Sequence, residues 1–555
     1  MKTVSLVGDL LHIKFPYDPE LVALVRSLPD RRWNAAAKEW TAPADLTTAK
    51  QLGEWGFSLS KEVEEWRNQQ LKSSSVSDID FFRLSPLLMG FQRDGIRFIE
   101  QHQGRALIGD EMGLGKTAQA LSWLRLHPEL RPAVIICPAS IKINWEREIR
   151  LWMDEQETVQ ILFGTDIAQT LFGNIIIVNY DILPNDTIAD PDDPKHRIEI
   201  PRTGWHEYLS DIKPKVVICD EAHNCKSRST RRTKAVKELC KGVPHILMLT
   251  GTPIVNRPAE AFNMLNIISP ARFPSFFHYA KEFCGAFRSR WGWDFSGASN
   301  LDKLHEKLQH IMVRRLKSEV LQDLPEKRRA IVPLEITNRK EYQRAEEDFV
   351  GWLHDKGEKI RAESASRAEA LASIEGLKQL TISGKLDTCL DWIADFLEAG
   401  EKLIVFATHK RTIEAVMQRF GDLAVKVDGS VTGEDRQLAV DRFQTDDSVR
   451  LFVGNIQAAG VGITLTAASN VAFLELGWSP GLHEQAEDRA HRIGQRDSVT
   501  IWYLIAQGTI EERICKLLDS KRKVLSRVLD GGEIENGGGI FETLLEEIKG
   551  EEDGN

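Results

Sequence analysis

The chain has 555 residues, a formal net charge of −10 at neutral pH and 42% hydrophobic residues. This length allows about three or four domains, each large enough to have its own hydrophobic core. No apolar run reaches the roughly 18 residues that a membrane-spanning helix needs, so the sequence predicts no membrane partner. Asp9 and Lys14 interrupt the apolar start of the chain, and we therefore expect no secretory signal.

The seven cysteines follow neither a metal-binding nor a disulfide pattern. No two of them form a Cys-x-x-Cys pair, so we expect no zinc site and no disulfide framework. Reduced cysteines indicate an intracellular protein. The compact layout favours the cytoplasm of a bacterium or of a virus-infected host over a nucleus, and no clear nuclear-import signal is present. Nothing in the sequence indicates an oligomer, so we expect a monomer.

Charge is distributed unevenly along the chain. Acidic residues dominate the Gly-rich end, residues 531–555, which we expect to form a solvated tail. Basic residues gather in short segments at 228–237, 314–317, 327–329 and 521–527. Binding to nucleic acid depends on where the cations lie and not on their sum, so the negative net charge does not exclude it.

Residues 1–60 are predicted to form a small α+β domain. Apolar and polar residues alternate over 11–15, as in a half-buried strand. Asp18 can cap a helix that Pro29 ends, and a second helix is expected over 44–53.

Between these helices, residues 31–41 favour a hairpin that carries Arg31, Arg32, Trp33 and Trp40. Two interpretations are open. The tryptophans can stack on bases while the arginines meet phosphates. Alternatively, both rings can belong to the core of a small domain, where aromatic side chains supply much of the burial. The residues by themselves favour the core.

The rest of the chain reads as two tandem α/β lobes. Residues 61–85 are polar and Ser-rich, and we interpret them as a linker with a helical start. Apolar runs alternate with amphipathic segments over 86–325 and again over 385–530, which predicts open, mostly parallel sheets. Residues 326–384 are charged and helical in pattern, as in an arm between lobes. The predicted strands are 105–108, 133–137, 175–178, 215–219, 245–249, 402–407, 424–427, 451–454, 471–474 and 500–504.

Residues 110–117, DEMGLGKT, follow a predicted strand and precede a predicted helix, which is the setting of a phosphate-binding loop. Gly113 and Gly115 let backbone N–H groups turn toward an anion, and the positive end of the helix dipole adds to them. Lys116 is expected to reach the β- and γ-phosphates of a bound nucleotide. The Thr117 hydroxyl is expected to hold Mg²⁺.

A second motif supports the phosphate loop against the alternative, which is a plain Gly-rich turn. The strand run 215–219 ends in Asp220 and Glu221, an acidic pair of the kind found beside nucleotides. Asp220 is expected to hold Mg²⁺ through water, and Glu221 to polarise the attacking water. Alone, the pair would indicate a solvated acidic turn. Asp110 remains a departure, because the strict loop pattern asks for glycine at its position.

Two further motifs suit a nucleotide-driven machine. Thr250, Gly251 and Thr252 follow a strand, where small hydroxyl residues can sense a γ-phosphate, although alone they indicate only a turn. Arg489 and Arg492, within QAEDRAHRIGQ, share a helix face because they are three residues apart. A mobile arginine at the γ-phosphate favours phosphoryl transfer. A surface helix with Glu–Arg pairs is the alternative.

Taken in order, these motifs resemble those of helicase superfamily two, and specifically those of the SWI/SNF-like DNA translocases. The resemblance covers about 86–530 and implies two RecA-like lobes. The family's own phosphate loop has a non-Gly start, which matches Asp110. The similar segments are 91–95, 110–117, 137–148, 178–180, 220–223, 249–253, 314–327, 404–407, 460–465 and 485–495.

The resemblance also implies ATP and Mg²⁺ as cofactors and assigns roles residue by residue. The implied ATPase site consists of Phe91, Gln92, Asp110, Gly113, Gly115, Lys116, Thr117, Asp220, Glu221, Arg489 and Arg492, with Gln92 reading the adenine. The implied coupling residues are His223, Thr250, Gly251, Thr252 and Gln485. The residues implied to follow one DNA strand are Ser140, Lys142, Asn179, Thr408, Lys410 and Thr464.

The N-terminal residues are similar to the HARP domain over 16–21, 28–33 and 38–40. This domain precedes the motor in annealing helicases of the SWI/SNF-like family and is implied to bind branched DNA. The resemblance therefore shifts the interpretation of the hairpin from core packing toward DNA contact by its arginines and tryptophans.

We expect an ATP-dependent translocase on double-stranded DNA that anneals or remodels branched DNA such as stalled forks. A motor that displaces proteins from DNA is the first alternative, but the sequence lacks the histone- or partner-binding modules usual for that class. A DNA-binding scaffold with an inactive nucleotide site is the second alternative. Intact Lys116, Glu221 and both arginines count against it.

Overall fold

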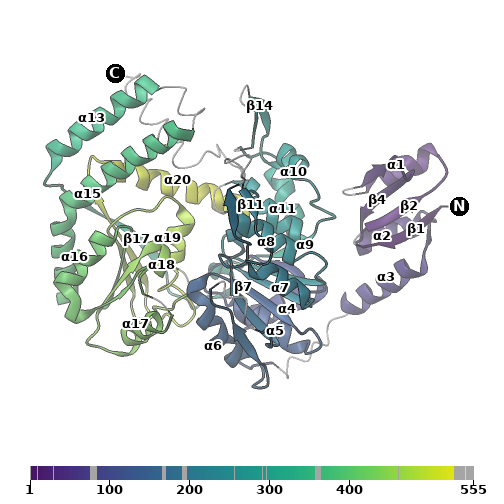
Figure 1. Ribbon diagram of the computed structural model, residues 1–555, viewed down its shortest axis with the longest axis horizontal. Helices are drawn as coiled ribbons and strands as arrows, with labels where there is room; N and C mark the ends of the chain where they lie inside the picture. The colour runs from purple at the N-terminus through teal and green to yellow at the C-terminus, as the bar shows by residue number, and fades with distance from the viewer. Residues whose placement is uncertain are drawn as a thin grey trace.

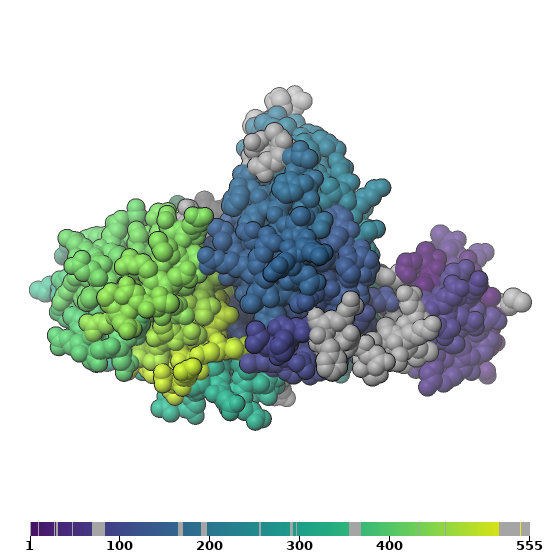
Figure 2. Space-filling model, turned by 90° about the horizontal axis from the view of Figure 1, so that it is seen from below, coloured from purple at the N-terminus to yellow at the C-terminus, as the bar shows by residue number. Residues whose placement is uncertain are grey.

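The structure is a computed structural model that describes residues 2–8, 10–28, 31–74, 84–164, 170–189, 197–254, 257–289, 292–295, 297–356, 364–431, 433–460, 462–530 and 544. It has three bodies, which we call the N-terminal unit (2–74), lobe 1 (84–320) and lobe 2 (327–530). Lobe 1 lies between the other two in both views (Figures 1 and 2).

The N-terminal unit is a mixed five-stranded sheet in the order β3-β4-β2-β1-β5 with helices packed on it. Asp18 caps α1 as predicted, because its carboxylate accepts hydrogen bonds from the N–H groups of Glu20 and Leu21 at 2.9 and 3.2 Å. The predicted hairpin is confirmed as β3 and β4, with Trp33 opposite Trp40. The elements are β1 (Thr3–Val7), β2 (Leu10–Lys14), α1 (Pro19–Ser27), β3 (Arg32–Asn34), β4 (Glu39–Pro43), α2 (Leu46–Glu54), β5 (Ser58–Leu59) and α3 (Lys61–Ser74).

Helix α3 extends the N-terminal unit beyond its predicted end at residue 60. The helical start of the predicted linker is present, but Val63 is fully buried in the core of the unit and Trp66 packs against that core. The linker prediction was wrong for this helix, because two apolar side chains are enough to dock a mostly polar helix. Residues 75–83 of the predicted linker lie outside the described residues.

Lobe 1 is a parallel seven-stranded sheet in the order β16-β6-β13-β12-β7-β9-β8. Helices cover both faces, so β7 and β9 bury every residue and read as continuous apolar runs in the sequence. Strands β8 and β16 have three and two residues, too few to show a pattern. The elements are α4 (Gly90–Gln101), β6 (Arg105–Ile108), α5 (Lys116–Leu126), β7 (Ala133–Cys137), η2 (Ala139–Ile141), α6 (Lys142–Trp152), β8 (Val159–Ile161), β9 (Ile175–Asn179), the hairpin of β10 (Thr187–Ala189) and β11 (Arg197–Glu199), α7 (Trp205–Asp211), β12 (Val216–Asp220), η3 (Ala222–Cys225), α8 (Arg231–Leu239), β13 (His245–Leu249), η4 (Pro258–Ala261), α9 (Phe262–Ile268), α10 (Phe276–Phe283), the hairpin of β14 (Phe287–Ser289) and β15 (Gly292–Asp294), α11 (Leu301–Gln309), β16 (Met312–Val313) and α12 (Lys317–Val320).

Lobe 2 is a parallel six-stranded sheet in the order β17-β22-β21-β18-β20-β19. The elements are β17 (Lys327–Leu334), α13 (Arg339–Lys356), α15 (Ser364–Glu398), β18 (Leu403–Ala407), α16 (Lys410–Phe420), η5 (Gly421–Leu423), β19 (Ala424–Val427), α17 (Gly433–Thr445), β20 (Leu451–Asn455), α18 (Ile456–Ala459), β21 (Asn470–Phe473), α19 (Pro480–Glu487), β22 (Val499–Ala506) and α20 (Ile510–Asp530).

The predicted helical arm, residues 326–384, differs from the structure at both ends. It begins with β17, an edge strand that pairs with β22. The strand opens with three basic residues and contains Pro333, which only an edge strand tolerates, so it does not resemble a buried central strand. It ends within α15, which runs without a break through residue 384. The second half of α15 buries Cys389, Ile393 and Leu397 in lobe 2, so this helix is part of the lobe and not a separate arm.

Two other sequence expectations concern features that are spread along the chain. All seven cysteines are buried, and none forms a disulfide. Within the residues that the structure describes, no helix combines the length and the apolarity needed to cross a membrane.

The predicted acidic tail lies outside the described residues apart from Leu544, which is buried in the core of lobe 2.

Candidate active site

The sheet of lobe 1 places the phosphate loop, the acidic pair and the threonine motif together. Strands β6, β13 and β12 are neighbours and parallel, so their carboxyl ends meet at one edge of the sheet. The loop 110–117 follows β6, Thr250 follows β13, and Asp220 ends β12. Ligands of open α/β sheets bind at this edge.

The phosphate loop has the backbone that its glycines predict. Gly113 and Gly115 have φ angles of +85° and +75°, in the left-handed region that glycine adopts freely. Lys116 begins α5, and its ammonium donates hydrogen bonds to the carbonyl oxygens of Asp110 at 2.8 Å and Glu111 at 3.3 Å. Burial lowers the pKa of Lys116, while the carboxylates of Glu221 and Asp110 oppose that shift. The ammonium therefore lies at the loop, within electrostatic range of the Glu221 and Asp110 carboxylates.

The side chain of Asp110, the first residue of the phosphate loop, is engaged within lobe 1, whereas its backbone carbonyl accepts the hydrogen bond from Lys116. The Asp110 side chain is fully buried. The carboxylate accepts two hydrogen bonds from the Arg315 guanidinium, at 2.9 and 2.6 Å, and one from the Gln119 amide at 2.9 Å. Arg315 also donates to the carbonyl oxygen of Phe91. The aspartate thus anchors the loop to the segment after β16, a role that glycine at this position cannot fill.

Replacing Arg315 by alanine is expected to lower the free energy of unfolding by about 3 kcal/mol, because it leaves the buried Asp110 carboxylate without its cation. Equilibrium unfolding in urea, followed over the transition at the lowest urea concentration, measures this loss of free energy. The matched control is Arg419→Ala, which breaks an exposed Arg–Asp pair with Asp391 and should cost at most about 1 kcal/mol. Equal losses in both variants would show that the Asp110 pair stabilises nothing beyond an ordinary surface contact.

Gln92 connects the start of α4 to the phosphate loop. Its amide is buried, accepts a hydrogen bond from the Met89 N–H at 2.9 Å and donates one to the Leu114 carbonyl at 3.2 Å. An added Cβ at Gly115 would lie 2.4 Å from its Nε2 atom, so glycine is also required there for space. The Phe91 ring lies 5.4 Å from the Arg315 guanidinium. Both residues therefore lie close to the loop, and their polar atoms are engaged by the protein.

Asp220 is held in place by three neighbours. Its carboxylate accepts hydrogen bonds from the Trp145 indole at 2.8 Å and from the Glu221 N–H at 2.9 Å. The Tyr180 hydroxyl donates to its backbone carbonyl at 2.8 Å. Burial, and then the charge of Glu221, raises the pKa of Asp220 to about 6.

Glu221 has the left-handed φ angle of +49°, a strained conformation that recurs at functional sites. Its buried Oε2 atom pairs with His223, whose Nδ1 atom is 3.2 Å away. Burial raises the pKa of Glu221, yet His223, Lys116 and Arg489 outweigh it and hold the pKa below its usual value. The carboxylate is therefore charged.

The predicted coupling residues of lobe 1 form one connected set. His223 lies between Glu221 and Thr250, with Nδ1 3.2 Å from the Thr250 hydroxyl. That hydroxyl accepts a hydrogen bond from the Thr252 N–H at 3.2 Å. An added Cβ at Gly251 would lie 2.4 Å from the Met112 side chain, so this turn packs directly on the phosphate loop.

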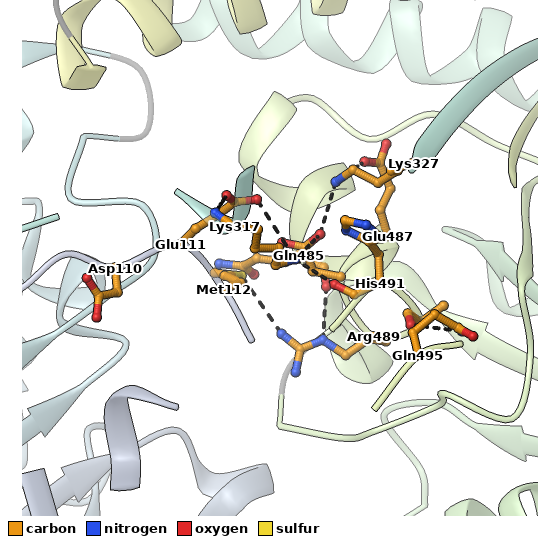
Figure 3. Close-up of polar contacts among 12 residues, drawn as sticks. Asp110, Glu111, Met112, Lys317, Lys327, Gln485, Glu487, Arg489, His491 and Gln495 are labelled. Carbon is orange, nitrogen blue, oxygen red and sulfur yellow. Dashed lines mark hydrogen bonds and ion pairs between the residues drawn. The ribbon is translucent and has the colours of Figure 1, made fainter. Parts of the chain in front are cut away.

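Arg489 and Arg492 reach the phosphate loop from lobe 2. The Arg489 guanidinium lies 3.8 Å from Met112 Sδ and donates to the carbonyls of Gln485 and Ile463 at 2.9 and 3.2 Å (Figure 3). The Arg492 guanidinium is 3.4 Å from the same Ile463 carbonyl. Burial lowers the pKa of both guanidinium groups, that of Arg492 to about 10. The prediction that the two arginines share a helix face was wrong, because α19 ends at Glu487 and both residues lie in the turns that follow it.

A buried ion network beside these arginines was not predicted as part of the site. The Lys317 ammonium lies 2.9 Å from Asp488, 2.6 Å from the His491 carbonyl and 3.8 Å from Glu111 (Figure 3). Lys327 lies 3.0 Å from Asp488 and 3.1 Å from Glu487. The basic segments 314–317 and 327–329 were visible in the sequence, but nothing local in the chain pairs them with acids at 487–488.

Arg329 completes the network from β17. Its guanidinium donates to both oxygens of the Glu487 carboxylate, at 2.9 and 2.6 Å. The Tyr503 hydroxyl donates to the same carboxylate at 2.8 Å. Glu487 is thereby fully buried and fully paired, and it fixes α19 and the arginine motif to the sheet of lobe 2.

Two of the predicted DNA-contacting residues are buried against each other. Lys142 donates to the Asn179 side chain at 3.1 Å and to the Leu162 carbonyl at 2.8 Å, and both side chains are 5% exposed. Burial lowers the pKa of Lys142. This arrangement withdraws Lys142 and Asn179 from the surface, so we omit them from the proposed DNA contacts. Ser140 remains exposed beside them.

In lobe 2, Thr408 belongs to a cluster around a buried carboxylate. Its hydroxyl donates to Glu475, which also contacts His409 Nδ1 at 2.7 Å and the Thr412 hydroxyl. Burial opposes ionisation of Glu475, but these bonds lower its pKa to about 2. Glu475 was not predicted, and it positions the loop after β18. Lys410 is exposed in the next helix and Thr464 is half-buried.

The lobes also touch through their predicted DNA motifs. An added Cβ at Gly462, whose φ is +71°, would lie 1.7 Å from Ile141 of lobe 1. Together with Arg489 at the phosphate loop, this contact defines a closed pair of lobes. The fold and the site thus define a nucleotide-dependent two-lobe machine with the arginines of one lobe at the loop of the other.

Comparison with known proteins identifies the family. A model described as "SNF2-related domain" matches residues 91–385, and one described as "Helicase conserved C-terminal domain" matches residues 384–494. The chain belongs to the SNF2-related family. Its two lobes are the RecA-like lobes of that family, as the sequence resemblance implied.

Several relatives are similar over most of this chain. It is 35% identical over 477 residues to "DNA annealing helicase and endonuclease ZRANB3" of Mus musculus, which covers 83% of this chain and 43% of the relative. It is 30% identical over 546 residues to the Caenorhabditis elegans homolog of "SWI/SNF-related matrix-associated actin-dependent regulator of chromatin subfamily A-like protein 1". That match covers 94% of this chain and 75% of the relative. The chain therefore spans less than half of the mouse relative.

Among solved structures, "Sulfolobus solfataricus SWI2/SNF2 ATPase core in complex with dsDNA" is 25% identical, with a TM-score of 0.38. The similarity covers 81% of this chain and 94% of that chain.

Proposed function

We propose that the chain is an ATP-hydrolysing motor that moves along double-stranded DNA and acts on branched DNA. The observation that carries the motor is the approach of Arg489, from lobe 2, to 3.8 Å from Met112 in the phosphate loop of lobe 1. A cation supplied across two bodies makes phosphoryl transfer depend on the distance between them. The reaction and the movement of the lobes are then one event.

ATP and Mg²⁺ are the cofactors that the residues fit. Asp220 and Glu221 are largely buried carboxylates, close enough to Lys116 to oppose the lowering of its pKa by burial. Together with the Thr117 hydroxyl and the Lys116 ammonium, they would supply the oxygen ligands and the cation that a Mg²⁺–nucleotide complex needs. Thr117 and Asp220 would hold Mg²⁺, which would neutralise phosphate charge and orient the γ-phosphate. Lys116, whose ammonium contacts loop carbonyls, would exchange those contacts for the β- and γ-phosphates.

The remaining residues divide the chemistry among them. Glu221 would orient the attacking water and accept its proton. Arg489 and Arg492 would stabilise the charge that develops on the transferred phosphoryl group. His223 would pass the state of this centre to Thr250, because it contacts both Glu221 and Thr250. Loss of the γ-phosphate removes the anion that the two arginines share with lobe 1, so the lobes separate.

The N-terminal unit gives the motor its preference for branched DNA. Its hairpin presents Arg31, Arg32 and a half-exposed Trp33, and it lies on the side of lobe 1 away from lobe 2 (Figure 1). Trp40 packs on the core and supports Trp33 at a centroid distance of 5.4 Å. Relatives named as DNA annealing helicases support the same substrate class. We place the domain boundaries at 2–74, 84–320 and 327–530.

The proposal also includes an intracellular, monomeric protein without zinc. Seven buried thiols, none in a disulfide, suit a reducing compartment. The relatives reported above come from animals, so they do not favour a bacterial or viral-host cytoplasm over a nucleus.

The test is ATP turnover with single-stranded, duplex and forked DNA, for the full chain and for a version lacking residues 1–80. We expect duplex to stimulate both proteins, and forks to stimulate the full chain more strongly. If truncation removes only the fork preference, the N-terminal unit is the junction reader. Equal stimulation by duplex and fork in both proteins would keep the motor and remove the branched-DNA role.

A further inference from the structure

An open cavity of about 770 Å³ lies between the N-terminal unit and lobe 1. One wall is the hairpin, with Arg31, Arg32 and Trp33. The other wall comes from α10 and α11, among them Lys303 and Lys307. These two walls are some 270 residues apart in the chain, so no sequence motif combines them.

Helix α11 presents one face to this cavity. Lys303, Glu306, Lys307 and His310 follow the spacing that places side chains together on a helix. The helix is anchored from its other side, where Leu304 and Leu308 are buried in the core of lobe 1. The packing of these two leucines therefore fixes the orientation of the helix, so its basic face points to the cavity.

The cavity carries an excess of positive charge. Arg31, Arg32, Lys303 and Lys307 are four cations, and Glu306 is the acidic residue among the described residues that line it. Glu282, just outside the lining, contacts Lys303 and lies 4.0 Å from Lys307. Among the described residues at this cavity, cations therefore outnumber carboxylates. Phosphate groups spaced along a nucleic acid backbone complement such an excess of cations.

Trp33 adds a flat apolar surface to the same cavity. Its ring is 51% exposed although it packs on Trp40, and it stands on β3, the edge strand of the N-terminal sheet. Charged residues on an edge strand also discourage strand pairing between molecules, which accounts for Arg32 but not for an exposed tryptophan. Cations combined with an accessible aromatic ring are the features of single-strand binding sites, since a base can stack only when it is unpaired.

We propose that this cavity binds the single-stranded segment of a branched DNA, with the hairpin and α11 gripping the same strand from opposite sides. This assignment rests on the proposed function and adds to it a second wall, contributed by the motor itself. The N-terminal unit is then not an independent tether, because its site is complete only when it lies against α11.

The experiment measures binding of the full chain to a fork with one single-stranded arm, to a fork with two duplex arms, and to linear duplex. The variants are Lys303→Gln, Arg32→Gln and their combination, with Lys50→Gln as control. Lys50 is an exposed lysine of the N-terminal unit, pairs with Glu54 at 3.8 Å and lies outside the cavity. Fluorescence anisotropy at several salt concentrations gives both the affinity and its salt dependence.

Each lost phosphate contact should weaken binding of the single-stranded arm about 5-fold at 0.1 M salt and reduce the salt slope by about 0.7. The double variant should therefore lose about 25-fold and about 1.4 of the slope. Lys50→Gln should change neither. Trp33→Ala should weaken the same complex about 5-fold or more, and Trp33→Phe should restore most of it, because stacking needs a ring. Unchanged thermal unfolding of each variant excludes a folding defect.

The outcomes separate this site from the proposed function. If the unaltered chain binds forks no more tightly than linear duplex, the branched-DNA function falls. If it prefers the single-stranded arm and Lys303→Gln keeps both affinity and salt slope, the function stands and the cavity is overturned. Equal losses on linear duplex and on the single-stranded arm would overturn the assignment to single strands.

Discussion

Lys116→Ala is expected to lower DNA-stimulated ATP turnover by about 100- to 1000-fold while leaving the fold intact. A single preorganised donor at a centre of developing charge contributes about this much to a rate. The loss should not unfold the protein, because the ammonium contacts loop carbonyls and no buried carboxylate directly, so its removal leaves no ion pair broken. Nucleotide binding, measured by equilibrium titration, should weaken in parallel.

The matched control is Lys241→Ala, which removes an exposed lysine of lobe 1 that pairs with Glu238 at 3.3 Å. Turnover in this control should equal that of the unaltered chain. Undiminished turnover in Lys116→Ala would remove the phosphate-loop assignment altogether. A loss of thermal stability in Lys116→Ala would instead show that the lysine is a structural part of lobe 1.

Arg489→Lys is expected to lower turnover about 1000-fold, with little change in nucleotide affinity. An arginine supplied across an interface contributes on the order of 10³ to 10⁵ in rate, and lysine lacks the planar fork that spans two phosphate oxygens. Nucleotide affinity should persist because Lys116 and the loop backbone belong to lobe 1. Single-turnover hydrolysis together with equilibrium binding separates the two effects.

Arg496→Lys is the control for this variant, since Arg496 is exposed in the same segment. It should hydrolyse ATP normally. Equal activity of Arg489→Lys and the control would mean that the lobe-2 arginine takes no part in the reaction. A parallel loss of affinity and rate would assign Arg489 to holding the nucleotide and not to the transition state.

The sequence alone predicted those parts of the molecule whose cause is local. The central strands of both lobes are buried on two faces, so their residues are apolar without interruption and their limits were correct to within one or two residues. Gly113, Gly115 and Lys116 were predictable because a phosphate loop is one continuous segment with fixed geometry. The hairpin of the N-terminal unit was predictable for the same reason.

What the sequence did not predict depends on contacts between distant segments. Asp110 was an anomaly in the loop until its partner Arg315, some 200 residues away, was visible. Lys142 and Asn179 are residue types that commonly bind phosphate, but in this fold their side chains bind each other. Strand β17 was missed because it begins with three basic residues and contains a proline. The acids that pair with Lys327, Glu487 and Asp488, lie about 160 residues later, at the end of α19 and just after it.

The network around Asp488 has a consequence for repeated opening of the lobes. Lys317 is fixed to lobe 1, where its N–H donates to Glu111 at 2.7 Å, whereas Lys327 belongs to the sheet of lobe 2. When the lobes part, Lys317 leaves with Glu111, and Lys327 stays 3.0 Å from Asp488. In the proposed opening, each of these charges therefore keeps one of its present partners, so the lobes can separate and rejoin many times without the penalty of an isolated buried ion.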